Sequence, residues 1–136
     1  MSQVNVEIVR GIYDAVARRD AATPFEVYAE DIVWDLSNSP SRATIMGSVY
    51  RGHEGVRQFW RDGVSVFRSV DLDVEELIDA DDQVVAVIRE RDIGRTSGAR
   101  VDASRVAVWT LAGGKVIRMQ IFDDRPAAFK AAGLEA

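Results

Sequence analysis

The chain has 136 residues, the usual size of a single domain, and we expect residues 1–136 to fold as one unit. It has no cysteine, which excludes disulfides, thiolate catalysis and cysteine-ligated metals. Its net charge of −5 would repel a phosphate backbone and argues against a nucleic-acid partner. No apolar run approaches the ~20 residues that cross a bilayer, and the N-terminus has no signal-peptide pattern. We therefore expect a cytoplasmic protein without a membrane partner.

The first half of the chain predicts three helices and one strand. Apolar residues recur at three- and four-residue spacing over about residues 3–18, which indicates an amphipathic helix. The segment TPFE resembles a capping box and predicts a short helix over about residues 24–29. Residues 31–36, rich in β-branched and aromatic side chains, predict a strand, and residues 37–48 form a polar loop. The clearest helical periodicity follows over about residues 56–67.

The second half predicts strands joined by tight turns. Gly113 and Gly114 are typical of a two-residue hairpin turn, and Gly133 would end a short closing helix over residues 126–132. The predicted strands cover residues 70–78, 84–93, 101–111 and 116–122. Helices followed by strands indicate an α+β fold. We expect a cone-shaped half-barrel, in which a curved antiparallel sheet is covered on its concave side by about three helices and encloses a hydrophobic pocket.

Motifs along the whole chain resemble one known family. They are RRD followed by VYAEDIVWDL, then YRGHEGVRQFW, WTLAGGKVIRMQIFDD and the closing AAFKAAGL. In order and spacing they are similar to the SnoaL-like branch of the nuclear-transport-factor-2-like superfamily. The resemblance implies the fold, but it does not assign an activity. The superfamily includes steroid isomerases, polyketide cyclases, epoxide hydrolases and dehydratases, so whether this chain is an enzyme stays open.

Two of the family's catalytic sets do not match this chain. The ketosteroid-isomerase branch needs a tyrosine and two acidic groups at places that carry Ile12, Leu36 and Ala107 here. The limonene-epoxide-hydrolase branch uses an arginine and two aspartates. Arg91 matches the arginine, but Ile93 and Ile121 stand where the aspartates would be. These apolar residues argue against both reactions.

Strand alternation, with the family as a guide to its direction, predicts which side chains enter the pocket. Its walls would be aromatic and apolar, with a few charges among them and a tyrosine hydroxyl at the rim. The predicted ligand-binding residues are Tyr13, Trp34, Arg89, Arg91, Arg105, Trp109 and Met119.

Three residues are candidates for acid–base chemistry. Asp123 is the foremost because apolar walls or arginines around a carboxylate would shift its pKa, although the sequence favours an ion pair with a strand arginine or exposure at the strand end. Asp35 would act only if a bulge turned it inward from a solvated face. His53, the single histidine, could shuttle a proton or bond to backbone groups at a helix start. Asp124 is expected to cap the closing helix.

Two functions fit these features. The chain could be an isomerase, cyclase or hydrolase that acts on a small hydrophobic molecule by acid–base chemistry, with no cofactor and no metal. It could instead be a non-catalytic ligand-binding or dimeric interaction domain. A homodimer is expected because one layer of helices leaves the outer sheet face uncovered. The apolar residues assigned to that outer face are Val84, Ala86, Ile88, Val106 and Val108.

Overall fold

The computed structural model describes residues 2–134; residues 1, 135 and 136 of the expected domain lie outside the described part. Its helical elements are α1 (Gln3–Ala17), the 3₁₀ helix η1 (Thr23–Val27), α2 (Pro40–Ala43), α3 (Gly52–Val66) and α4 (Arg125–Ala131). Its strands are β1 (Tyr28–Asp35), β2 (Val49–Arg51), β3 (Phe67–Ala80), β4 (Gln83–Gly94), β5 (Arg100–Ala112) and β6 (Lys115–Phe122). Every element that the sequence predicts is present, and α2 and β2 lie in or beside the segment expected to be a loop.

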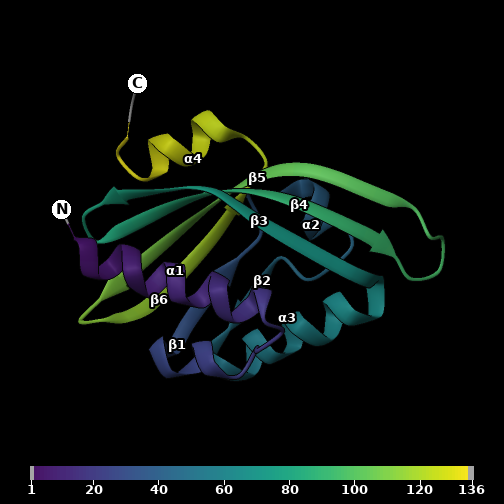
Figure 1. The fold of residues 1–136 in the computed structure, drawn as a ribbon, viewed down its shortest axis with the longest axis horizontal. Coiled ribbons are helices and arrows are strands. Elements are labelled where there is room, and N and C mark those ends of the chain that lie inside the picture. Colours follow the sequence, from purple (N-terminus) through teal and green to yellow (C-terminus); the bar gives the residue numbers. More distant parts are fainter. Residues whose placement is uncertain (1, 135–136) are drawn as a thin grey trace.

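The six strands form one open sheet in the order β2-β1-β6-β5-β4-β3. Strands β3 to β6 make the expected antiparallel meander, but β1 runs parallel to β6, so the sheet is mixed. Figure 1 shows α1 and α3 on one side of the sheet and α4 on the other. The half-barrel of the α+β class is confirmed, with its main core between the sheet and the first helices.

Strand β4 faces the opposite way from the sequence prediction. Its residue Val84 pairs with Trp109, and Ile88 pairs with Arg105, and directly paired residues point to the same face of a sheet. Val84, Ala86 and Ile88 therefore belong to the core beneath α1 and α3, and their expected position on the outer face is wrong. A one-residue error in alternation exchanges the two faces of a strand.

The outer face is partly covered by the chain itself. Val85, Val106 and Val108 pack there against Ala128 and Phe129 of α4. The apolar surface that motivated a homodimer through this face is thus buried by α4, and dimerisation stays a prediction. Among residues 2–134, no helix is long and apolar enough to cross a membrane.

Local sequence patterns predicted most of the turns and helix caps at their correct positions. Gly113 and Gly114 have φ values of 57° and 80°, as a type I′ hairpin turn requires. The Asp124 side chain accepts the amide of Ala127 and caps α4, as predicted. The capping box at TPFE is wrong, because Asp20 accepts the Thr23 amide at 3.0 Å instead.

Candidate functional site

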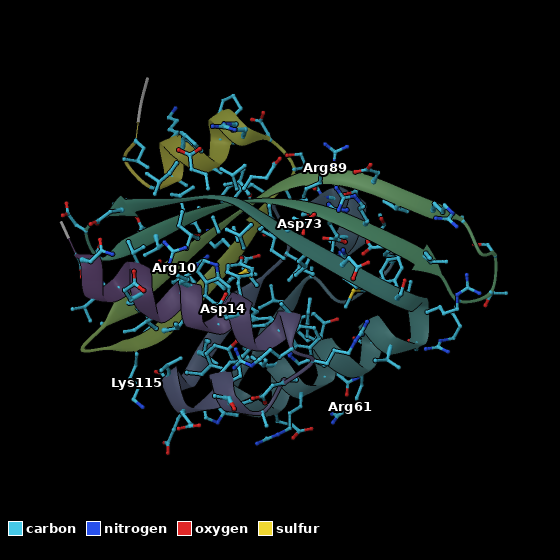
Figure 2. All side chains as sticks on the ribbon, viewed as in Figure 1. Arg10, Asp14, Arg61, Asp73, Arg89 and Lys115 are labelled. Atoms are coloured by element: carbon cyan, nitrogen blue, oxygen red, sulfur yellow. The ribbon has the colours of Figure 1, made fainter. Side chains whose placement is uncertain are left out.

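A cavity of about 380 Å³ lies between the sheet and helices α1 and α3. This volume is within the range of ordinary small-molecule sites, ~300–1,000 Å³. Figure 2 shows side chains from these helices and from the strands converging in this layer. Seven aromatic residues line the cavity: Tyr13, Tyr28, Trp34, Phe59, Trp60, Phe67 and Trp109. Its walls are therefore mainly apolar, with several aromatic rings among them.

Trp34 of β1 stands at the centre of this aromatic wall. Its ring meets those of Phe59, Trp60 and Trp109 edge-on, with centroids 5.0, 6.2 and 6.0 Å away. Edge-to-face contacts of this kind hold rings in fixed orientations. The Trp34 indole Nε1 is buried and has no hydrogen-bond partner among the described residues. Trp34, Trp109 and the predicted Met119 all line the cavity.

Tyr13 brings a polar group to the cavity from α1. Its hydroxyl oxygen accepts a hydrogen bond from Trp109 Nε1 at 3.0 Å, and the two rings meet edge-on. Burial raises the pKa of Tyr13 well above its ordinary value, so the phenol stays protonated at neutral pH. Because the oxygen is the acceptor in the bond to Trp109, the O–H proton remains available to a ligand oxygen.

A buried ion network closes one wall of the cavity. Glu90 of β4 and Arg42 of α2 both line it, and their carboxylate and guanidinium are in contact. Arg105 Nε donates to Glu90 Oε1 at 3.2 Å, and Arg42 also pairs with Asp92 at 3.3 Å. Burial lowers the pKa of Arg42 to about 10, which still leaves it charged at neutral pH. Glu90 thus holds two buried cations at once.

Asp123 lies outside the cavity lining and acts as an anchor. Its carboxylate accepts hydrogen bonds from Ser39 Oγ at 2.6 Å, Arg105 Nη1 at 2.7 Å and the Ser41 amide at 3.1 Å. Partial burial alone would raise its pKa, but the bonds from Ser39 and Ser41 and the charge of Arg105 outweigh burial and lower it. Asp123 is therefore ionised at neutral pH and ties α2 to the end of β6.

The other two acid–base candidates also point away from the cavity. Asp35 accepts hydrogen bonds from the Ser37 amide at 2.9 Å and from Arg118 at 3.0 Å, on the outer side of β1. Partial burial opposes these bonds, yet the net effect lowers the pKa of Asp35. His53 Nε2 lies 3.0 Å from the carbonyl oxygen of Tyr28 at the start of α3. Neither residue lines the cavity.

The inward direction expected for Arg89 and Arg91 is wrong. Arg89 makes two hydrogen bonds to Asp102, at 2.8 and 3.0 Å, and Arg91 pairs with Asp73 at 2.5 Å. All four side chains are exposed on the outer face of the sheet. The cause is the alternation of β4, which turns Glu90 inward in place of its neighbours. Arg105 does point to the inner face, as expected, but it meets Glu90 and Asp123 rather than the cavity.

Sequence reasoning missed the two residues that form the charged wall. Arg42 lies in a polar segment expected to be a loop, and nothing local indicates that it is buried. Glu90 lies between two arginines on a strand in which the five residues from Val84 to Ile88 are all apolar. Only the pairing of β4 with β5 decides which alternate set faces inward.

Replacing the anchor should weaken the fold in a pH-dependent manner. We expect Asp123→Asn to cost about 1–2 kcal/mol at neutral pH, because Arg105 loses a charged partner and two serines lose a charged acceptor. The folded-state pKa lies below the unfolded value of about 3.9, so the charge stabilises the fold above that value and ceases to do so as the pH falls below it. Denaturant unfolding at several pH values should show the variant and the parent converging in acid.

Asp124→Asn is the matched control for that experiment. It removes the neighbouring carboxylate, but asparagine caps a helix about as well as aspartate, so its cost should stay within about 0.5 kcal/mol. Equal losses of unfolding free energy in the two variants would contradict the role of Asp123 as an anchor. So would a loss in Asp123→Asn that does not change with pH.

The fold and its cavity define an α+β domain built around an internal pocket. The chain belongs to the SnoaL-like domain family, whose model matches residues 9–119 and confirms the resemblance of the motifs. Among curated proteins, no sequence matches significantly.

Similar solved structures agree with this fold. An NTF2-like protein of unknown function from Burkholderia pseudomallei is 24% identical, with a TM-score of 0.79 over 96% of this chain and 97% of that one. TerC, co-crystallized with polyporic acid, is 22% identical, with a TM-score of 0.78 over 96% and 99%. An NTF2-like protein from Burkholderia thailandensis is 26% identical, with a TM-score of 0.77 over 90% and 91%.

Proposed function

We propose that this chain binds a small, mainly apolar molecule with a flat ring system in the cavity. The observation that carries the proposal is the set of aromatic rings that line the pocket, among which the Tyr13 hydroxyl is held in place by Trp109. Apolar walls with few, well-placed polar groups are typical of small-molecule sites. The co-crystallization of TerC with polyporic acid supports the same use of this fold.

The geometry of the walls indicates how such a ligand would be held. Trp34, Trp109 and Met119 offer faces and edges to a ring from the sheet side, and Phe59 and Trp60 do so from α3. A ring buried among aromatic side chains gains both dispersion and the removal of apolar surface from water. An oxygen on the ligand would accept a hydrogen bond from the Tyr13 hydroxyl, which would fix the orientation of the ring.

The charged lining favours binding over general-base catalysis. Two carboxylates line the described cavity, Asp20 and Glu90. Glu90 is paired with Arg42 and Arg105, and Asp20 accepts hydrogen bonds from Ala22 and Thr23. A general base needs a carboxylate or imidazole within reach of the substrate's proton, and Asp123, Asp35 and His53 lie outside the lining. A carrier or sensor of a hydrophobic molecule is therefore the better supported of the two functions.

A filled cavity should abolish this binding. Gly63 of α3 lines the cavity, and a Cβ at this position would meet only Met46 Cε, at 4.0 Å. Gly63→Leu therefore adds a side chain to the space without replacing a packed one. We expect the neutral dye phenylnaphthylamine to bind the parent with enhanced fluorescence, and to bind Gly63→Leu at least about tenfold more weakly, a loss of about 1.4 kcal/mol.

Gly11→Leu provides the control. Gly11 lies on the exposed side of α1, outside the cavity, with no atom within 4 Å of an added Cβ. Both variants replace a glycine inside a helix and should gain about 0.5–1 kcal/mol of helix stability. Only Gly63→Leu should lose the dye. A parent protein that fails to bind the dye, or equal binding by the two variants, would refute the proposal.

A further inference from the structure

The cavity opens to solvent between the end of α1 and the junction of α3 with β3. Among its lining residues, the exposed ones mark this mouth: Arg19, Ala21, Val64, Arg68 and Arg95. They come from three separate segments of the chain. Three of the five are arginines, in a chain whose net charge is −5. The mouth is thus a local concentration of positive charge on an acidic protein.

The charges of these arginines are not neutralised by carboxylates. Within residues 2–134, the guanidinium groups of Arg19 and Arg68 make no hydrogen bond and no ion pair. Arg95 donates from Nε to the carbonyl of Val64 at 2.7 Å and from Nη2 to that of Phe67 at 3.4 Å. Carbonyl groups at the end of α3 orient this cation and leave its net charge in place.

Among the described residues, one carboxylate lies at the mouth, that of Asp20, and it already accepts hydrogen bonds from the backbone. Asp20 accepts the amides of Ala22 and Thr23, and the bonds from Thr23 lower the pKa of Asp20. It is one negative charge against three positive ones. The outer sheet face behaves differently, because Arg89 and Arg91 each pair there with an aspartate. A single exposed arginine without a partner costs the fold little free energy. Three of them around one apolar opening create a positive potential that attracts anions.

We propose that the ligand of this cavity carries an anionic group, such as a carboxylate or an ionised enol, that stays at the mouth between Arg19, Arg68 and Arg95. This inference rests on the proposed function and adds the chemical class of the ligand: rings inside, negative charge outside. Guanidinium groups suit such an anion because they donate paired hydrogen bonds as well as charge. The aromatic interior would bind the rings of any similar ligand, and the arginines would select the acidic one.

Two dyes that differ by a single sulfonate test this selection. Anilinonaphthalene sulfonate is the anionic counterpart of the neutral phenylnaphthylamine, and each reports binding by its fluorescence. We expect the parent protein to bind the sulfonate dye about fivefold or more tightly than the neutral dye, a difference of about 1 kcal/mol, because three cations surround the sulfonate. In the double variant Arg19→Gln/Arg68→Gln, the ratio of the two affinities should fall at least about twofold, because only Arg95 then remains beside the sulfonate. Raising the salt concentration should lower the ratio in the parent.

Arg51→Gln is the control for overall charge. Arg51 of β2 is exposed and lies outside the cavity lining, so its removal changes the net charge of the chain without touching the mouth. The dye ratio of this variant should match that of the parent. If the neutral dye binds but the ratio is unchanged in the double variant, or falls equally in Arg51→Gln, the inference about the anion is refuted and the proposed function stands. If neither dye binds the parent, both are refuted.

Discussion

Glu90→Ala is expected to lower the free energy of unfolding by about 3–5 kcal/mol, the usual cost of removing one partner from a buried ion pair. Glu90 is 4% exposed and contacts the guanidinium groups of both Arg42 and Arg105. Without it, Asp92, at 3.3 Å, is the one carboxylate among residues 2–134 that still pairs with Arg42. Denaturant unfolding at neutral pH measures the loss.

An exposed carboxylate gives the comparison. Glu54 pairs with Arg61 at 2.6 Å, but its side chain is 73% exposed, so Glu54→Ala should cost no more than about 1 kcal/mol. The double variant Arg42→Met/Glu90→Leu should recover much of the loss, because it replaces a buried charge pair by apolar groups of similar size. Burial already raises the pKa of Asp92, which allows that carboxyl to become neutral once Arg42 is gone. A loss below about 1 kcal/mol in Glu90→Ala would show that water reaches these arginines.

Trp34→Ala is expected to cost about 3–5 kcal/mol, because it deletes the ring at the centre of the aromatic wall and leaves a void. Trp34 is 3% exposed and meets four aromatic rings edge-on. Trp34→Phe should lower the free energy of unfolding by far less than the loss of side-chain volume implies. It removes a buried indole N–H that has no partner among the described residues, and such a donor itself costs about 1–3 kcal/mol.

Trp109→Phe separates these two contributions. Trp109 is also 3% exposed, but its Nε1 donates to Tyr13 at 3.0 Å. The same substitution there loses a hydrogen bond as well as volume, so we expect it to be more costly than Trp34→Phe by about 1–2 kcal/mol. Thermal or denaturant unfolding of both variants gives the comparison. Equal costs would mean that the Trp34 N–H finds a partner in solution.

Only part of the candidate site could be predicted from the sequence. Alternation on β1, β5 and β6, with its direction taken from the family resemblance, predicted that Trp34, Trp109 and Met119 enter the cavity, and each of them lines it. The predicted acid, Asp123, is instead held by Ser39 and Ser41, which lie 84 and 82 residues away in the chain. Local sequence patterns cannot show a partner that lies so far away in the chain. Asp123 was therefore predicted to be an acid–base residue, whereas in the fold it holds α2 against the end of β6.

By itself, the sequence determined what depends on near neighbours. Periodicity placed the long helices, Gly113 and Gly114 specified the hairpin turn, and Asp124 specified the cap of α4, because each of these acts through a few adjacent residues. Together with the order of elements, they were enough to predict the α+β class and a pocket between the sheet and its helices.

Tertiary structure alone decided which charges surround that pocket. Both faces of β4 begin with apolar residues, so only pairing with β5 turns Glu90 inward and sends Arg89 and Arg91 outward. The same long-range packing brings Arg42 against Glu90 and gathers arginines from three segments at the mouth. Charge placement depends on contacts between residues far apart in the chain, because the cost of burying a charge is offset only by the partner that the fold brings to it.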